Sequence, residues 1–159
     1  MPSPVKMPLK RKATANLPVA FWDASALVPL CCWQPQTKAA RRARRLFPQM
    51  VVWWATSVER TSALRRLDRA QAFTAQEIQQ AIQELDRLRH RWTEMAPSEE
   101  VRDMAEHLLG KHSLRAADAL QLAAAFAWCN SYSNGKTFVG GDDRLLDAAE
   151  SKGFSVVRL

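Results

Sequence analysis

Short apolar runs alternate along the chain with segments in which apolar residues recur at helical spacing. The apolar runs lie at residues 19–22, 50–54, 137–139 and 154–157. Apolar runs of this kind are typical of strands that are buried on both faces, as in a parallel sheet. In the longest segment between them, Ile78, Ile82, Leu85 and Leu88 follow the period of a helix. This alternation of strands and helices predicts an α/β domain with a mainly parallel central sheet.

The helical segments have recognisable starts and stops. Thr74 and Glu77 form a capping-box pair at the start of a long helix that we expect to run to Trp92. Gly110 and Gly153 end two later helices. The predicted helices cover residues 24–30 (disturbed near Pro29), 37–47, 57–70, 75–92, 99–109, 116–128 and 143–152.

Residues 1–18 differ in composition from the rest. This segment is rich in proline, carries the cations Lys6, Lys10, Arg11 and Lys12, and contains no acid. We interpret it as a flexible basic tail ahead of one folded domain over residues 19–159. The tail has no apolar block, so it does not look like a secretory signal. No apolar run approaches the roughly 20 residues that span a bilayer, so no membrane contact is expected.

Three acids follow the ends of predicted strands, and each has a structural alternative. Asp23 follows the first strand, where it could cap the next helix or place a carboxylate at the carboxyl edge of the sheet. Glu59 follows the second strand, and Thr56 could form a capping box with it. Asp142 follows the third strand, where it or its neighbour Asp143 could cap the last helix.

A fourth acid, Asp118, is the only charged residue between Ala116 and Phe126. A lone carboxylate in an apolar helix is costly to bury unless it is paired or bound to a metal. Because successive parallel strands end at the same edge, the four acids are expected to meet there and to raise one another's pKa. A divalent cation such as Mg²⁺ prefers oxygen ligands and would relieve that repulsion. Sites of this type hydrolyse phosphodiesters.

The overall charge points to a polyanionic partner. The formal net charge is +7 and the isoelectric point about 9.8, which is typical of proteins that bind nucleic acid but also occurs in merely soluble basic proteins. The helix over residues 37–47 is dense in cations, which either form a solvated face or contact phosphates. The candidate phosphate contacts in it are Arg41, Arg42, Arg44 and Arg45.

Cysteines and tryptophans carry less information. Three cysteines, two of them adjacent, make a poor disulfide framework, so we expect free thiols in a reducing cytoplasm. Trp22, Trp53 and Trp128 are expected in the core. Trp33 and Trp92 are the better candidates for a surface that contacts a partner or stacks on a base.

Four blocks of sequence, in this order, resemble the PIN-domain family, and within it the VapC-type toxin ribonucleases. The resemblance covers roughly Val19 to Leu159, and its third block is the most specific. The blocks are Phe21-Trp-Asp23-Ala-Ser25-Ala-Leu27, Thr56-Ser-Val-Glu59, Leu114-Arg-Ala-Ala-Asp118-Ala-Leu-Gln-Leu and Phe138-Val-Gly-Gly-Asp142-Asp-Arg-Leu145.

The resemblance implies a PIN-like three-layer α/β/α fold and a Mg²⁺- or Mn²⁺-dependent endoribonuclease. In that family the acids matched by Asp23, Glu59, Asp118 and Asp142 hold the metal. Ser25 matches a hydroxyl position beside the metal water, and Asp143 is a substitute for Asp142. Arg115, in the third block, joins the candidate RNA contacts. The family also implies a homodimer and a small antitoxin that covers the acidic pocket.

One departure from the family keeps an alternative open. Many relatives carry threonine or serine two residues before the last aspartate, where this chain has Gly140. The alternative is an RNA-binding module whose catalytic site has decayed. An aspartyl-phosphate phosphatase or receiver domain is a weaker possibility, since the phosphatase type needs an aspartate where Ser25 stands.

Overall fold

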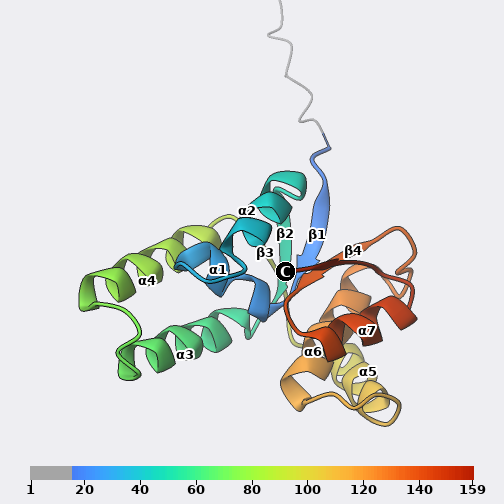
Figure 1. Ribbon diagram of the computed structural model, residues 1–159. Coiled ribbons are helices and arrows are strands. Elements are labelled where there is room, and N and C mark those ends of the chain that lie inside the picture. The colour runs from blue at the N-terminus through green and yellow to red at the C-terminus, as the bar shows by residue number, and fades with distance from the viewer. Residues whose placement is uncertain (1–15) are drawn as a thin grey trace, which may run out of the picture.

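A five-stranded parallel sheet forms the centre of the molecule (Figure 1). The computed structural model describes residues 16–159, so most of the predicted basic tail lies outside the described residues. The strands occur in the order β3-β2-β1-β4-β5, and every neighbouring pair is parallel. The predicted α/β class and parallel sheet are thus confirmed. The strands are β1 (Val19–Trp22), β2 (Gln49–Trp53), β3 (Thr93–Met95), β4 (Thr137–Gly140) and β5 (Ser155–Arg158).

The helices connect these strands. They are η1 (Ala24–Ala26), α1 (Val28–Cys31), α2 (Thr37–Leu46), α3 (Thr56–Arg69), α4 (Ala75–Arg89), α5 (Glu99–Leu109), α6 (Ala116–Trp128) and α7 (Asp143–Ser151). The single short helix expected over residues 24–30 is divided into η1 and α1. Pro29 lies in the first turn of α1, where its missing N–H removes no helical hydrogen bond.

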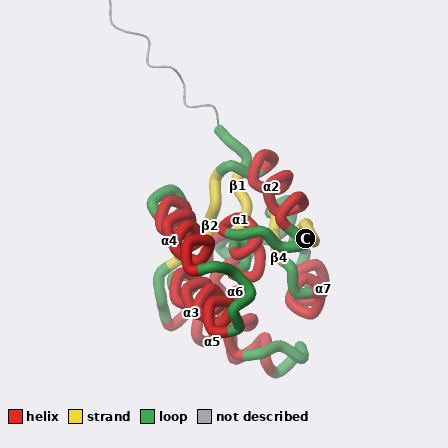
Figure 2. Tube along the Cα trace, turned by 60° about the vertical axis from the view of Figure 1, so that its left-hand side comes forward, coloured by secondary structure: helices red, strands yellow, loops and turns green. Residues whose placement is uncertain are grey.

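Alternate strand residues build two separate cores. Phe21 and Val51 face α5, α6 and α7, whereas Trp22 and Val52 face the side formed by α1 to α4. This follows from the two-residue period of a strand, because both faces of a parallel sheet are covered by helices. The result is a three-layer α/β/α arrangement, with the short strands lying between helices on both sides (Figures 1 and 2).

The segment around Trp92 corrects the sequence interpretation. Helix α4 ends at Arg89, and Trp92 is only 8% exposed instead of lying on the surface. Its indole Nε1 donates a hydrogen bond to Glu94 Oε1 at 3.0 Å, within the unpredicted strand β3. Trp33 is 73% exposed, as expected, while Trp22 and Trp53 are buried and Trp128 is half-buried.

The connections reverse direction at the centre of the sheet. From β1 the chain builds β2 and β3 on one side and then crosses to build β4 and β5 on the other. In open α/β sheets, the crevice beyond the carboxyl ends of the strands at such a reversal is where ligands bind. Asp23 and Asp142 follow the ends of the two strands, β1 and β4, that flank this point. No helix within residues 16–159 has the length and apolar character of a membrane span.

Candidate active site

Asp23 leaves the end of β1 and is almost fully buried, with 3% of its surface exposed. Its backbone N–H donates to the Val139 carbonyl at 2.9 Å, which fixes it beside β4. Its side chain also caps η1, accepting a hydrogen bond from the Ser25 N–H at 3.0 Å. Asp23 is therefore both the N-cap residue of η1 and the carboxylate at the edge of the sheet, so the two sequence interpretations hold together. Burial raises the pKa of Asp23, and the hydrogen bonds from Ser25 only partly oppose that rise.

Ser25 joins the two central strands across the site. Its hydroxyl donates to the Asp23 carboxylate and accepts a hydrogen bond from the Gly141 N–H at 2.8 Å. One side chain therefore orients the acid that follows β1 and holds the loop that follows β4. The family resemblance implies a hydroxyl at this position.

Glu59 lies in the first turn of α3, but its predicted capping box with Thr56 is wrong. Ala55 is the N-cap residue of α3, and no side chain caps that end. Instead Glu59 Oε1 accepts a hydrogen bond from Gln121 Nε2 at 3.0 Å, and the same amide donates to Thr56 Oγ1 at 3.2 Å. Burial raises the pKa of Glu59, and the charges of Asp23 and Asp118 raise it further.

Asp118 and Asp142 line an open pocket of about 290 Å³, together with Ser113, Arg115 and Arg144. Asp118 stands in the first turn of α6. Burial raises its pKa first, and the charges of Asp23 and Asp142 add to that rise. Asp142 is exposed and caps α7, accepting a hydrogen bond from the Leu145 N–H at 2.9 Å. Asp118 is therefore the link in this group of acids, since the charges of Asp23 and Asp142 act on it and its own charge acts on Glu59.

A half-buried arginine, Arg60, acts electrostatically on two of these carboxylates. Arg60 follows Glu59 on α3. Its positive charge partly opposes the rise in the pKa of Asp23 and of Glu59. Its own pKa is lowered by burial, and its Nε has no hydrogen-bond partner among the described residues. Arg60 therefore neutralises part of the negative charge but leaves Asp118 and Asp142 to repel each other.

The donor set fits a magnesium-type ion that keeps part of its water. The donors are hard carboxylate oxygens, and burial holds the pKa of Asp23, Glu59 and Asp118 above its ordinary value, with carboxylate repulsion adding to the rise at Glu59 and Asp118. Within residues 16–159, no three histidine, cysteine, aspartate or glutamate side chains form a ready-made ligand cluster. Mg²⁺ commonly takes only one or two protein carboxylates and completes its shell with water and phosphate oxygens. A site with few protein ligands is therefore compatible with this ion, which does not need a complete set of protein ligands.

The other predicted residues divide between several places. Asp143 lies on the outside of α7, where it pairs with Arg158 at 3.2 Å, so its carboxylate is engaged away from the pocket. Arg115 precedes α6 and lines the acidic pocket. Arg41 and Arg44 line a different and larger hollow, while Arg42 and Arg45 are exposed on α2.

Gly140, the last residue of β4, is closely packed between Leu146 and Asp23. A Cβ added there would lie 3.1 Å from Leu146 Cδ2 and 3.5 Å from the Asp23 Cβ. A serine or threonine would therefore require Leu146 to move. The absence of a side chain at position 140 therefore goes together with the close approach of Leu146 to the backbone there.

Sequence reasoning missed Gln121 and Arg60. Gln121 is fully buried, one turn along α6 from Asp118, and is a polar side chain in an otherwise apolar helix. That isolation, and its three-residue spacing from Asp118, was the signal that could have identified it. Arg60 gave no comparable signal, since charged residues are common in α3.

Comparisons with known proteins support the fold. The sequence matches no protein-family model, and no curated protein resembles it. Two similar solved structures each have a TM-score of 0.56. One is a toxin-antitoxin complex from Klebsiella pneumoniae, at 15% identity over 77% of this chain and 86% of that one. The other is PAE2754 from Pyrobaculum aerophilum, at 22% identity over 90% of this chain and 92% of that one. At these identities the likeness establishes a shared fold.

Proposed function

We propose that this protein is a Mg²⁺- or Mn²⁺-dependent endoribonuclease of the PIN/VapC type. The observation that carries the proposal is the group of acids at the carboxyl edge of the sheet, three of which have raised pKa values. Such an arrangement destabilises the protein unless a cation is bound, and residues that lower stability without helping the fold are typical of functional sites. The net charge of +7 elsewhere suits a polyanionic substrate.

Each side chain has a role in this proposal. Asp23, Asp118, Glu59 and Asp142 would hold the ion, while Gln121 orients Glu59 and Ser25 orients Asp23. The bound ion supplies a water of lowered pKa and stabilises charge on the phosphoryl oxygens. Arg115 and Arg144 line the same pocket, where their guanidinium groups can donate hydrogen bonds to a phosphate of an RNA strand. Hydrolysis would leave a 5′-phosphate and a 3′-hydroxyl.

The test is RNA cleavage by Asp118→Asn. This variant keeps the size of the side chain but removes a carboxylate charge, so we expect loss of at least 100-fold in Mg²⁺-dependent cleavage. Asp103→Asn is the matched control, because Asp103 is an exposed aspartate on α5, in the helix that precedes α6. Undiminished cutting by Asp118→Asn, or equal losses in both variants, would reject the assignment.

We also propose that the chain is the toxin of a toxin-antitoxin pair, acting as a homodimer in the cytoplasm. The solved complex from Klebsiella pneumoniae, which shares the fold, supports this role. The expected result is that expression halts growth and that co-expression of a small antitoxin from the neighbouring reading frame restores it. If Asp118→Asn still halted growth, the growth arrest would not depend on RNA cleavage, and this result would count against a toxin that acts as a nuclease.

Gly140 favours a second candidate, an RNA-binding module without catalysis. The strand-end hydroxyl common in the resembled family is absent, and Leu146 occupies its space. This candidate predicts salt-sensitive RNA binding with no cleavage, even in Mn²⁺. Measuring binding and cleavage on one preparation distinguishes it from the nuclease.

A further inference from the structure

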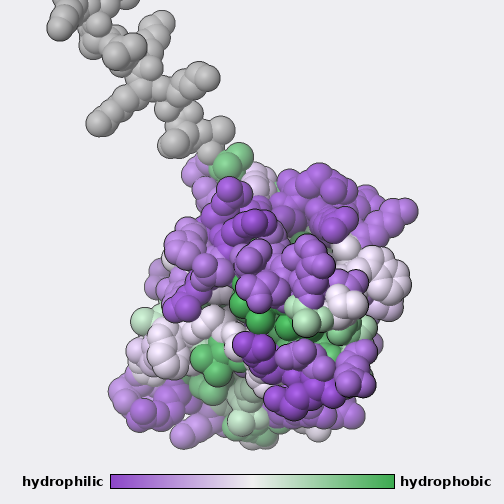
Figure 3. Space-filling model, turned by 90° about the vertical axis from the view of Figure 1, so that its left-hand side faces the viewer, coloured by the Kyte–Doolittle hydropathy of each residue, from purple (hydrophilic) through white to green (hydrophobic). Residues whose placement is uncertain are grey.

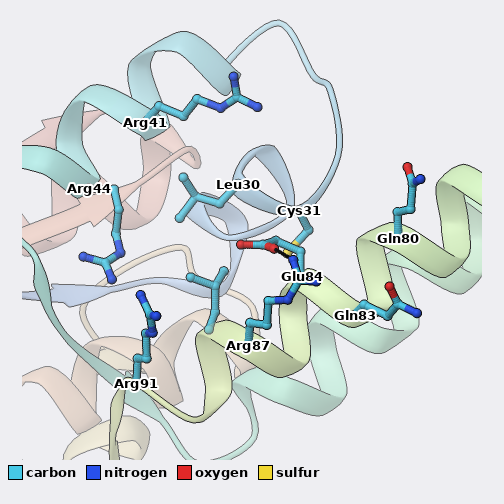
Figure 4. A pocket seen from close by; sticks show the side chains of 10 residues that line it. Leu30, Cys31, Arg41, Arg44, Gln80, Gln83, Glu84, Arg87 and Arg91 are labelled. Carbon is cyan, nitrogen blue, oxygen red and sulfur yellow. Dashed lines mark hydrogen bonds and ion pairs between the residues drawn. The ribbon is translucent and has the colours of Figure 1, made fainter.

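A second charged site lies away from the acidic pocket, on the side of the molecule formed by α1, α2 and α4. It is a hollow of about 710 Å³, which we call the arginine hollow (Figure 4). Arg41 and Arg44 reach it from α2, Arg87 from α4, and Arg91 from the turn after α4. Leu30 and Leu88 supply apolar surface. The sequence analysis singled out the α2 arginines, but their partners come from a helix about 45 residues later in the chain.

Positive charge in the arginine hollow exceeds the negative charge available to balance it. Glu84 is the carboxylate among its lining residues, and it already pairs with Arg87 at 2.9 Å. Within residues 16–159, neither Arg41 nor Arg91 makes an ion pair. Cys31 adds no charge near neutral pH, because burial raises the pKa of its thiol to about 12.

Arg44 and Arg91 lie close together in the folded protein, although they are far apart in the sequence. Their guanidinium groups point toward each other in Figure 4. Arg44 donates to the Pro48 carbonyl at 2.7 Å, which fixes its position. Burial and the charge of Arg91 both lower the pKa of Arg44. Like charges held at one place are destabilising on their own and are relieved by an anion between them.

An exposed aromatic ring continues this surface. Trp33, 73% exposed, lines two smaller hollows that share Arg41 with the large one. One of those hollows adds Lys38 and Arg45 to the positive side, and the other adds one carboxylate, Glu77, which accepts hydrogen bonds from Thr74. Guanidinium groups beside an exposed indole ring match a single nucleic-acid strand, whose phosphates pair with arginines while a base stacks on the ring.

We propose that the arginine hollow binds a single RNA strand through its phosphates, with Trp33 stacking on a base, at a site separate from the acidic pocket. An acidic protein segment would find the same charges and could also contact Trp33, but several arginines beside one aromatic ring match the phosphates and bases of a strand more closely. Figure 3 shows this side of the molecule as largely hydrophilic around a strip of hydrophobic residues. A protein partner would bind to the hydrophobic strip, whereas RNA phosphates would bind to the charged residues. The choice of RNA rests on the proposed function, whereas the phosphate site itself does not.

The test measures binding of a short fluorescein-labelled single-stranded RNA to the full chain in EDTA, where metal-dependent cutting is absent. In Arg41→Gln/Arg91→Gln we expect at least tenfold weaker binding at low salt. The slope of log affinity against log salt should fall by about 1.4, since each lost phosphate contact removes roughly 0.7. Arg102→Gln/Lys136→Gln is the control, because it removes two exposed charges from α5 and the segment before β4.

A second comparison isolates the aromatic contact. Trp33→Ala should weaken RNA binding by roughly fivefold or more, the lower end of what stacking of one base contributes, and Trp33→Phe should restore most of it. Polyglutamate serves as the competing anion. Equal affinity for polyglutamate and RNA, with no effect of Trp33→Ala, would overturn the RNA assignment in favour of an acidic protein partner.

The results separate this inference from the proposed nuclease. Equal losses in the hollow and control double variants, both with a wild-type melting profile, would overturn the inference even if the wild-type chain cuts RNA. Weaker binding confined to the hollow variants would support it even if no cleavage were seen in Mg²⁺ or Mn²⁺. The basic residues of positions 1–15 are the same in every variant, so their contribution cancels.

Discussion

Gln121 connects the acidic pocket to the body of the protein. Its amide donates to both Glu59 and Thr56, while its own Oε1 is buried with no partner among the described residues. A fully buried amide with an unpaired oxygen contributes little to stability, because the unpaired atom loses its hydration. Its main effect is electrostatic, since its hydrogen bond lowers the pKa of Glu59 against the raising effect of burial.

Replacing Gln121 with leucine should therefore change activity more than stability. Without the amide, the pKa of Glu59 rises further, so the acidic limb of the pH–rate profile moves to higher pH. Cleavage should fall by about 10–100-fold, as for other residues that orient metal ligands. Leu122→Met, a buried substitution at the next position in α6, should leave the profile in place. A profile that shifts equally in both variants would contradict this role.

Asp118 allows a stability measurement that needs no RNA. The pKa of Asp118 in the folded chain lies above its ordinary value of 3.8. The folded state therefore binds a proton more readily than the unfolded state, and stability declines as pH rises from about 3.8 through the folded pKa. In EDTA, Asp118→Asn should melt at a higher temperature than the wild type at pH 7, and the difference should vanish below pH 3.8. A variant that melts lower at pH 7 would show that the carboxylate stabilises the fold.

At the scale of elements, two threonine–glutamate pairs with the same spacing form different hydrogen bonds. Thr74 and Glu77 form the predicted capping box at the start of α4, with hydrogen bonds of 3.2 Å and 2.7 Å in the two directions. Thr56 and Glu59 have the same spacing but form none, because Ala55 is the N-cap residue of α3, and both side chains bind Gln121 of α6 instead. Local spacing cannot reveal that difference, since it depends on a helix more than 60 positions away.

Thr74→Ala should lower the free energy of unfolding by about 1 kcal/mol, the usual effect of losing an N-cap. RNA cleavage per folded molecule should be unchanged, because neither Thr74 nor Glu77 lines the acidic pocket. Denaturant unfolding and a cleavage assay on the same preparation check both statements. Loss of cleavage without loss of stability would mean that the start of α4 takes part in function.

Strand β3 shows where sequence patterns stop being informative. It has three residues at the sheet edge, with an exposed threonine and glutamate, so it offers no apolar run. It forms because Trp92 packs into the core beneath it and because the Trp54 N–H donates to the Met95 carbonyl at 3.1 Å. The four longer strands each lie in a mainly apolar stretch, and their existence and parallel direction could be predicted.

For the whole molecule, magnesium binding should couple to folding. A ligand that binds only the folded state stabilises it by about 2.7 kcal/mol when present at roughly one hundred times its Kd. We expect Mg²⁺ to raise the melting temperature of the wild type at pH 7 and to leave Asp118→Asn nearly unchanged. The effect should weaken toward pH 5, because protons compete for carboxylates whose pKa values are raised. Equal shifts in the wild type and Asp118→Asn would indicate binding elsewhere.

The two charged sites were predictable to different extents. The four acids could be placed together because each follows a strand end or begins a helix at one edge of the sheet. The arginine hollow could not, because Arg87 and Arg91 belong to a helix and turn whose orientation toward α2 depends on tertiary packing. The α2 arginines alone fitted a solvated surface equally well.

The last residue of the chain has a practical consequence for purification. The Leu159 N–H donates to the Gly140 carbonyl at 3.0 Å, and Gly140 packs against Asp23. Any residues added after Leu159 would therefore emerge beside the acids, whereas Val19 begins β1 at the opposite edge of the sheet. A hexahistidine affinity tag at the carboxyl terminus would bring imidazoles and their nickel next to these carboxylates. A cleavable amino-terminal tag is the appropriate choice for every metal titration described above.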